Sequence, residues 1–117
     1  MTSVPRAAAA AGGQPAIDLA HLDRQTMGDP ALRGEVLALM RDQIDDIAPR
    51  LELSWGADRA ALAHKLKGAA RGVGAFALAA AAGLVEAEPD VEPHLAALQE
   101  RMREAAEAIA SLAQRHG

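Results

Sequence analysis

The chain has 117 residues, half of them apolar, with a formal net charge of −4 and no cysteine. This is the length of one domain. The negative charge gives no electrostatic reason to expect nucleic acid as a partner, and the lack of cysteine excludes disulfides and thiolate metal sites. Only Trp55 and Phe76 are aromatic, so the core consists of aliphatic residues. We therefore expect an all-α protein, because the residue types that favour strands are scarce.

Residues 1–16 are a predicted disordered tail rich in alanine and glycine, followed by a helical domain over residues 17–115. Arg6 and the alanines after it superficially resemble a signal peptide, but the apolar run is too short for one. The longest uncharged stretch, residues 72–85, is shorter than the ~20 residues that a membrane span requires. We therefore expect no membrane as a partner.

Capping residues mark the first helix boundaries. Asp18 is the predicted N-cap of a short helix that ends near Met27-Gly28. Asp29-Pro30 then supplies an N-cap and a proline at the first position of a second helix.

The second helix is predicted from apolar residues spaced three and four apart. Pro49 lies late in this pattern and is expected to kink or end the helix, because proline removes a backbone hydrogen bond. Asp42, Asp45 and Asp46 are expected to form a solvated face rather than a metal cluster. The apolar positions are Leu32, Val36, Leu39, Met40, Ile44, Ile47 and Leu51.

The third helix is predicted to run to about Val73, where Gly74 ends it. Its N-cap is either Ser54 or Asp58, and Trp55 is expected to pack over its first turn.

A fourth helix follows from residue 75 to about residue 86, and a fifth begins after a turn at residues 88–90. The alternating four–three spacing of the fifth is typical of a helix packed lengthwise in a left-handed bundle. The expected apolar anchors are Phe76, Leu78, Leu84 and Val85 in the fourth helix and Val91, Leu95, Leu98, Met102, Ala105, Ile109 and Leu112 in the fifth.

The candidate functional residues lie in the third helix. At about 100° per residue, His64, Lys67, Gly68 and Arg71 share one face, which we expect to be exposed to solvent. The apolar stripe opposite contains Leu62, Leu66, Ala69, Ala70 and Val73.

Gly68 is informative because glycine inside a helix costs roughly 0.5–1 kcal/mol relative to alanine. Its missing side chain indicates that another group approaches the ring of His64 closely. Gly72, one turn further along the same face, also lacks a side chain, and we call Gly68 and Gly72 together the bare strip. Neutral imidazole is a nucleophile, and the charge of Lys67 can neutralise phosphoryl oxygens once they are attached. This combination is what a phosphoryl acceptor needs.

The run His64-Lys65-Leu66-Lys67-Gly68-Ala69-Ala70, followed by Val73-Gly74, resembles the motif of histidine-containing phosphotransfer (HPt) domains of bacterial and plant phosphorelays. That motif reads His-x-Leu-Lys-Gly-Ser/Ala-Ala, then a hydrophobic residue and glycine. Leu78 and Val85-Glu86 fall at its later Leu and Leu-Glu places, with valine replacing leucine. The resemblance covers about residues 17–115. It implies an antiparallel up-and-down four-helix bundle with an additional short N-terminal helix, and no catalytic apparatus of its own.

The resemblance implies a phosphocarrier rather than an enzyme. His64 would accept a phosphoryl group from a receiver-domain aspartate and pass it to another receiver, with Lys67 stabilising the phosphate and Gly68 giving steric access. The implied partners are receiver domains of a hybrid histidine kinase or of response regulators, which supply Mg²⁺, whereas this chain has no cofactor or metal of its own. We expect a cytoplasmic monomer, since one chain has enough helices to close the bundle. The candidate docking surface comprises Lys65, Arg71, Gly72, Met40 and Gln43.

Three alternatives remain at this stage. The first is a degenerate HPt-like module that binds a receiver or kinase without phosphotransfer. The second is the phosphoacceptor domain of a larger kinase, and the third is a structural or metal-binding helical bundle. Against a metal site, the residues one turn before and after His64 are Ala60 and Gly68, which supply no second ligand. His21, His94 and His116 have no motif around them and are expected to be ordinary solvated histidines.

Overall fold

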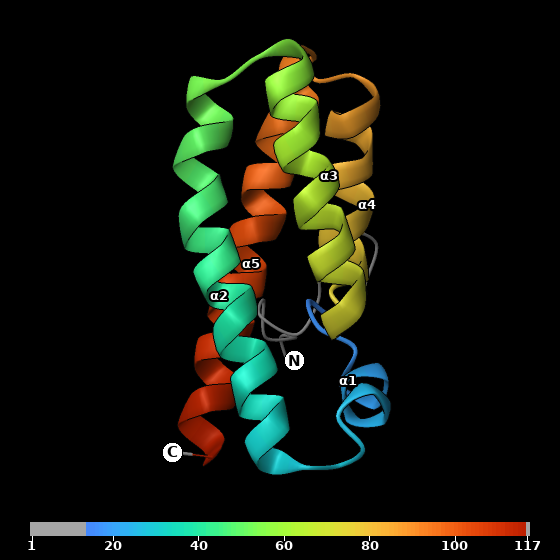
Figure 1. The fold of residues 1–117 in the computed structure, drawn as a ribbon, viewed down its shortest axis with the longest axis vertical. Coiled ribbons are helices and arrows are strands. Elements are labelled where there is room, and N and C mark those ends of the chain that lie inside the picture. Colours follow the sequence, from blue (N-terminus) through green and yellow to red (C-terminus); the bar gives the residue numbers. More distant parts are fainter. Residues whose placement is uncertain (1–13, 117) are drawn as a thin grey trace, which may run out of the picture.

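The computed structural model describes residues 14–116, so residues 1–13 of the predicted tail lie outside the described part. The end of the predicted tail is ordered instead, since Ala16 is buried at 6% exposure. The described part of the chain is all-helical. Four long helices lie side by side, and the short first helix crosses one end of them (Figure 1). The helices are α1 (Leu19–Gln25), α2 (Pro30–Leu53), α3 (Gly56–Val73), α4 (Phe76–Ala87) and α5 (Glu92–His116).

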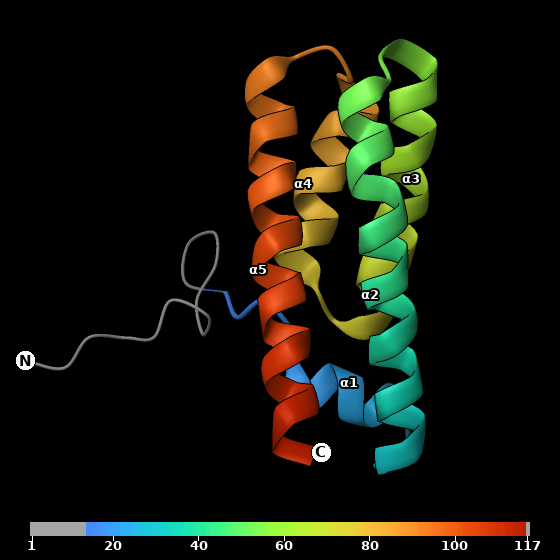
Figure 2. The ribbon, with the colours of Figure 1, turned by 90° about the vertical axis from the view of Figure 1, so that its left-hand side faces the viewer.

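The long helices enclose one core. α2 contacts α3, α3 contacts α4, α4 contacts α5, and α5 contacts α2, while α1 packs on α3. Figure 2 shows the same arrangement from the side, with α1 below the ends of α3 and α4. Residues that are less than 2% exposed come from every helix and include Leu22, Ile47, Leu51, Leu66, Leu78, Val85 and Leu98. Within residues 14–116, no helix is both long enough and apolar enough to cross a membrane.

The predicted caps of the first two helices are confirmed. The Asp18 carboxylate accepts a hydrogen bond from the backbone N–H of His21 at 3.1 Å. The Asp29 carboxylate accepts from Ala31 at 2.9 Å, and Pro30 occupies the first helical position of α2. These side chains satisfy N–H groups that have no partner within the helix.

Gly74 ends α3 as predicted, with a left-handed φ of 85°. A Cβ atom at this position would stand 2.9 Å from the backbone oxygen of Asp18, because the N–H of Asp18 donates to the Gly74 carbonyl at 2.8 Å. Glycine is therefore required both by the backbone conformation and by the close approach of the chain entering α1.

Neither residue predicted to cap α3 does so. Ser54 is instead the C-cap of α2, and its hydroxyl donates to the Leu51 carbonyl at 3.1 Å. The first N–H of α3, at Gly56, is bound at 2.9 Å by the carboxylate of Asp90, in the turn between α4 and α5. Trp55 is 75% exposed rather than packed over the first turn of α3.

Other corrections concern which apolar residues are buried. In α2, Leu37 is in the core, whereas Leu39 is 65% exposed. Leu84 and Phe76 of α4 are also exposed, at 49% and 38%. α2 does not end at Pro49 but continues to Leu53. Since Pro49 lies on the exposed side of α2, water can satisfy the carbonyl that it leaves without a helical partner.

Arg59 in α3 is the one buried charged residue of the core in the described chain, at 6% exposure. Its guanidinium donates to the carbonyl of Leu51 at the end of α2 and to that of Pro89 after α4, each at 3.0 Å. One side chain thus ties together the ends of three helices at the pole of the molecule opposite α1.

We predict that Arg59→Ala destabilises the fold by at least about 1 kcal/mol, because both carbonyls lose a charged donor and an acceptor left unsatisfied costs about 1–3 kcal/mol, while the Leu51 carbonyl keeps the Ser54 hydroxyl as a donor. The matched control is Arg50→Ala, which removes an exposed arginine paired with Asp46 and should cost less than about 1 kcal/mol. Urea unfolding of both variants measures the difference. Equal losses would contradict the role of Arg59.

Candidate functional site

His64 stands on the exposed face of α3, and its side chain is 69% exposed. Its Nδ1 atom lies 2.8 Å from Oε2 of Glu86 on α4. Among the described residues, nothing is hydrogen-bonded to the other ring nitrogen, Nε2. A Cβ atom on Gly68, one turn further along α3, would have no neighbour within 4 Å. The Nε2 side of the ring is therefore open to another molecule.

Lys67 lies across α4 instead of extending into solvent, which corrects the expectation that its side chain is exposed. Its side chain is 21% exposed, and its Nζ atom is 2.6 Å from Oε1 of Glu86. The stem of Lys67 lies against Gly83 of α4, where a Cβ atom would stand 3.6 Å from Cδ of Lys67, an ordinary van der Waals contact. Glu86 therefore contacts both His64 and Lys67, with one carboxylate oxygen on each.

The electrostatics of Glu86 decide which nitrogen of His64 is the nucleophile. The contact with Lys67 lowers the pKa of the Glu86 carboxyl below its usual 4.5; burial opposes this shift, and the contact with His64 adds to it. Glu86 is therefore ionised at neutral pH and can only accept hydrogen bonds. In neutral His64 the proton must then be on Nδ1, which leaves the lone pair on the exposed Nε2.

The arrangement has the parts that nucleophilic attack by a histidine requires. The nucleophilic nitrogen faces outward, the other nitrogen is held by a carboxylate, and an ammonium group lies one turn away. A nucleophile, a group that orients it and a nearby cation can together transfer a phosphoryl group.

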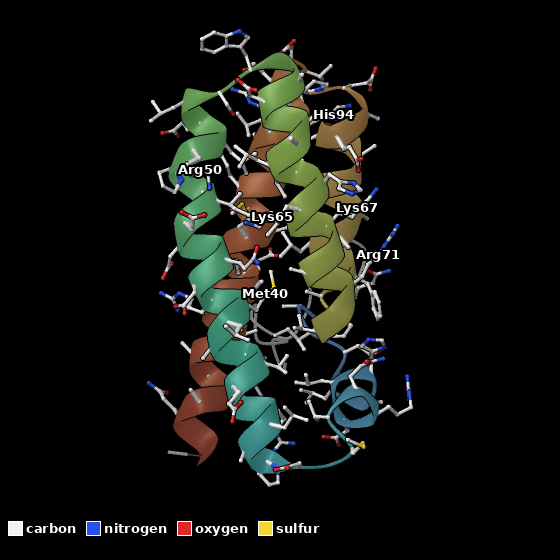
Figure 3. All side chains as sticks on the ribbon, viewed as in Figure 1. Met40, Arg50, Lys65, Lys67, Arg71 and His94 are labelled. Carbon is white, nitrogen blue, oxygen red and sulfur yellow. The ribbon has the colours of Figure 1, made fainter. Side chains whose placement is uncertain are left out.

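The residues of the candidate docking surface do not form one patch. Figure 3 shows Lys65 on the side of α3 toward α2, and Lys67 and Arg71 on the side toward α4. Lys65 and Leu62 line a groove of about 530 Å³ between α2 and α3, together with Arg50, Leu53, Ser54, Asp58 and Ala61.

Two residues expected on the docking surface, Met40 and Gln43, belong to α2 and differ in how far they are exposed to solvent. Met40 is 2% exposed and therefore belongs to the core, which corrects that prediction. Gln43 is half-buried. On α3, a Cβ atom on Gly72 would meet nothing within 4 Å, so the bare strip beside His64 does extend by a further turn.

The other histidines are less solvated than expected. His94 contacts the carboxylate of Glu88 through Nε2 at 2.9 Å, which is the opposite ring nitrogen from the one that His64 uses. The ring of His21 packs edge-on against Phe76 with centroids 5.0 Å apart. The side chain of His116 lies outside the described residues.

Glu86 is the candidate site residue that the helix faces of the sequence did not indicate. It lies 22 residues after His64 in the chain, and only its place in the Leu-Glu part of the motif marked it. Its part in the site depends on how α4 packs against α3, which a helical wheel of α3 does not contain.

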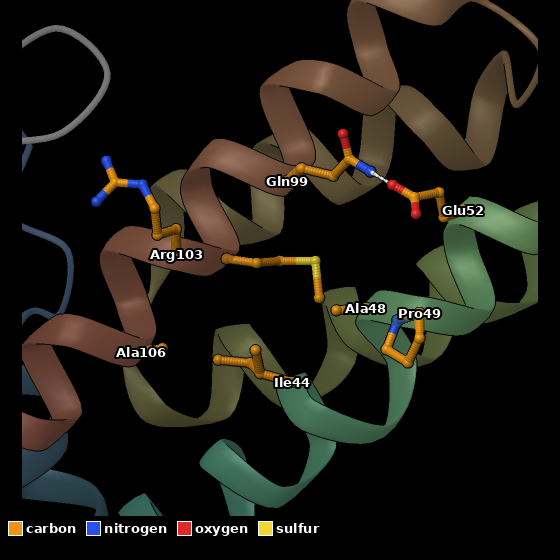
Figure 4. Close-up of a pocket in the computed structure, with 8 residues that line it drawn as sticks. Ile44, Ala48, Pro49, Glu52, Gln99, Arg103 and Ala106 are labelled. Carbon is orange, nitrogen blue, oxygen red and sulfur yellow. Dashed lines mark hydrogen bonds between the residues drawn. The ribbon is translucent and has the colours of Figure 1, made fainter.

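On the opposite side of the molecule, a shallow hollow of about 370 Å³ lies between α2 and α5 (Figure 4), with a hydrogen bond from Gln99 to Glu52 at its edge. Within the described residues, no group of three histidine or acidic side chains could hold a metal ion. Comparison with protein-family models, curated proteins and solved structures finds no match for this chain.

We predict that Glu86→Gln lowers stability at pH 7 and that its difference from the wild-type protein closes in acid. A carboxyl with a lowered pKa in the folded state stabilises the fold above its unfolded value of 4.5, and this contribution is lost as the pH falls through the lower folded value. Thermal unfolding of both proteins between about pH 7 and about pH 3 measures the gap. A gap that stays constant down to the lowest pH would contradict the ionic role of Glu86.

Proposed function

We propose that this protein is a histidine phosphotransfer protein of a phosphorelay and that His64 is its phosphoacceptor. The observation that carries the proposal is the exposed Nε2 of His64, in a ring held at Nδ1 by Glu86 and beside the uncovered Gly68. A nitrogen nucleophile on an exposed helix face suits a group that arrives on another protein.

The proposed fold is the antiparallel up-and-down four-helix bundle with a short N-terminal helix that HPt domains have. It is supported by the closed ring of contacts among α2, α3, α4 and α5. The short connections between successive long helices also support it, because they favour antiparallel neighbours. The motif at residues 64–74 is the reason to assign the family.

In the proposed reaction, a receiver domain carrying an aspartyl phosphate docks over the exposed face of α3. The Nε2 lone pair forms the bond to phosphorus, and the P–O bond to the aspartate breaks with its electron pair going to the carboxylate oxygen. Lys67 lies one turn from the nucleophile and can offset the charge of the attached phosphoryl group. The receiver supplies Mg²⁺, and this chain supplies nucleophile, local charge and surface.

The proposed partners are therefore receiver domains of a hybrid kinase or of response regulators, and the proposed form is a cytoplasmic monomer. Lys65 and Arg71 flank the strip on either side and would face the acidic surroundings of a receiver phosphorylation site. Gly72 would let that partner approach the α3 backbone closely. Transfer onward to a second receiver is the reverse of the same displacement.

We predict that His64→Gln abolishes phosphoryl uptake without loss of helical structure, because the side chain is exposed and only its nucleophilic nitrogen is essential. The matched control is His94→Gln, which removes the other histidine that contacts a glutamate and should leave uptake unchanged. Each purified protein is incubated with a kinase and a panel of radiolabelled phospho-receivers, and acid-labile label is counted.

Undiminished label on His64→Gln would contradict the assignment of the phosphoacceptor. Binding of a receiver to the wild-type protein without any transfer across the panel would instead favour a module that binds without phosphotransfer.

A further inference from the structure

Two large apolar side chains are exposed where α2 passes into α3, at the end of the bundle opposite α1 (Figure 1). Leu53, the last residue of α2, is 79% exposed, and Trp55, directly before α3, is 75% exposed. Ser54 between them turns inward, since its hydroxyl donates to the Leu51 carbonyl. Because the backbone at Ser54 and Trp55 is extended, its two neighbours point to the other side, toward solvent. We call Leu53 and Trp55 the exposed pair.

The fold does not account for the exposure of these two side chains. Tryptophan is largely buried on average, and this chain has one tryptophan and one phenylalanine with which to build a core. The backbone beside the exposed pair is nevertheless held in place, because the N–H of Gly56 is bound by the carboxylate of Asp90. Apolar side chains presented on a fixed connection mark an interaction surface, and tryptophan is among the residues that contribute most to binding at such surfaces.

The charged groups nearest to Trp55 are acidic. The Asp90 carboxylate lies beside it, bound to the residue that follows it in the chain. Asp58 and Glu92 are also exposed at this end of the molecule. The cation among them, Arg59, is buried and is bound to two backbone carbonyls.

Leu53 lies in the groove of about 530 Å³ between α2 and α3, together with Asp58. Two cations line the same groove, but neither lies beside Trp55. Arg50 is paired with Asp46 at 2.8 Å, and Lys65 is about 15 Å from Trp55 along α3, at 1.5 Å per helical residue. The surface around the indole ring is therefore acidic.

This charge decides what kind of partner fits the exposed pair. A second copy of the chain docked through the same surface would bring identical carboxylates face to face, and the anionic head groups of a membrane would be repelled as well. An arginine or lysine is instead attracted by the carboxylates and is also bound favourably over the face of an indole ring.

We propose that the exposed pair is a docking site for a basic amphipathic segment of another protein, in which an arginine or lysine stacks on Trp55 and an apolar side chain covers Leu53. Trp55 is about 13 Å from His64 along α3, so a segment bound at the end of the bundle leaves Nε2 of His64 open. The inference does not rest on the proposed function, since it involves neither His64 nor a phosphoryl group.

Trp55 is the only tryptophan of the chain, so its fluorescence reports on this site directly. The full-length protein is titrated with two synthetic amphipathic peptides that lack tryptophan. The first carries arginines and leucines, and the second has glutamate in place of each arginine. Fluorescence anisotropy of the labelled basic peptide then measures its affinity for the variants Trp55→Ala, Leu53→Ala and Asp58→Asn. The matched control is Leu39→Ala, which removes a 65% exposed leucine of α2 outside the proposed site, and circular dichroism checks that each variant is folded.

We expect the basic peptide to shift the emission of Trp55 to shorter wavelength, and its affinity to fall severalfold between about 50 mM and about 300 mM salt, because exposed charges are screened. Trp55→Ala should weaken binding at least about tenfold. Leu53→Ala and Asp58→Asn should each weaken it about two- to fivefold, as expected of single contacts at an exposed surface. Leu39→Ala and His64→Gln should bind the peptide as the wild-type protein does.

A dissociation constant above about 1 mM for the basic peptide, equal binding of the acidic peptide, or undiminished binding by Trp55→Ala would overturn the inference. A shift in emission that depends on protein concentration alone would show instead that a second copy covers the exposed pair. A shift on addition of phosphatidylcholine vesicles would show that a lipid surface does so. Either of these two results would also overturn the inference, and every one of these outcomes leaves the proposed function to be judged by transfer to His64.

Discussion

The site depends on the close packing of α4 against α3. The carboxylate of Glu86 reaches His64 and Lys67 only if the two helices lie near each other. Buried alanines on both helices, including Ala63 and Ala82, permit that approach, and Gly74 makes the sharp turn between them. A larger residue at any of these positions would separate the helices and withdraw Glu86 from the ring. The alanine content of the chain therefore has a consequence for chemistry as well as for packing.

The helix boundaries that depend on local chemistry were predictable from sequence. Asp18, Asp29 and Gly74 act within a turn of their own position, through a side-chain cap or a left-handed φ. The start of α3 was not predictable in this way, because the side chain that binds its first N–H, at Gly56, is Asp90, which is 34 residues away in the chain. Leu39 was misplaced for a related reason. Leu37 and Leu39 both fit a three–four spacing, and the position of the neighbouring helices decides which of them is buried.

The candidate site was predictable in part. His64, Lys67 and Gly68 lie on one helix at fixed angles, so the periodicity of α3 alone places them on a common face. Glu86, which contacts that face, is on α4. The angle between two helices does not follow from the sequence pattern of either helix alone. The same limit explains Met40, which is buried although it was expected on the docking surface, and Lys67, which lies along α4 although its own helix would allow it to extend into solvent.

The proposed transfer depends on the uncovered approach that α3 leaves to His64 beside Gly68. This dependence is tested most directly by Gly68→Leu, with unfolding and phosphotransfer measured on the same sample. Because nothing lies within 4 Å of a Cβ at Gly68, leucine should raise stability by about 0.5–1 kcal/mol through helix propensity. Its side chain would lean over the preceding turn toward His64 and block transfer. Gly34→Leu on α2, where a Cβ is equally free, should be similarly stable and transfer normally. A stable Gly68→Leu protein that accepts the phosphoryl group at the wild-type rate would contradict the claim.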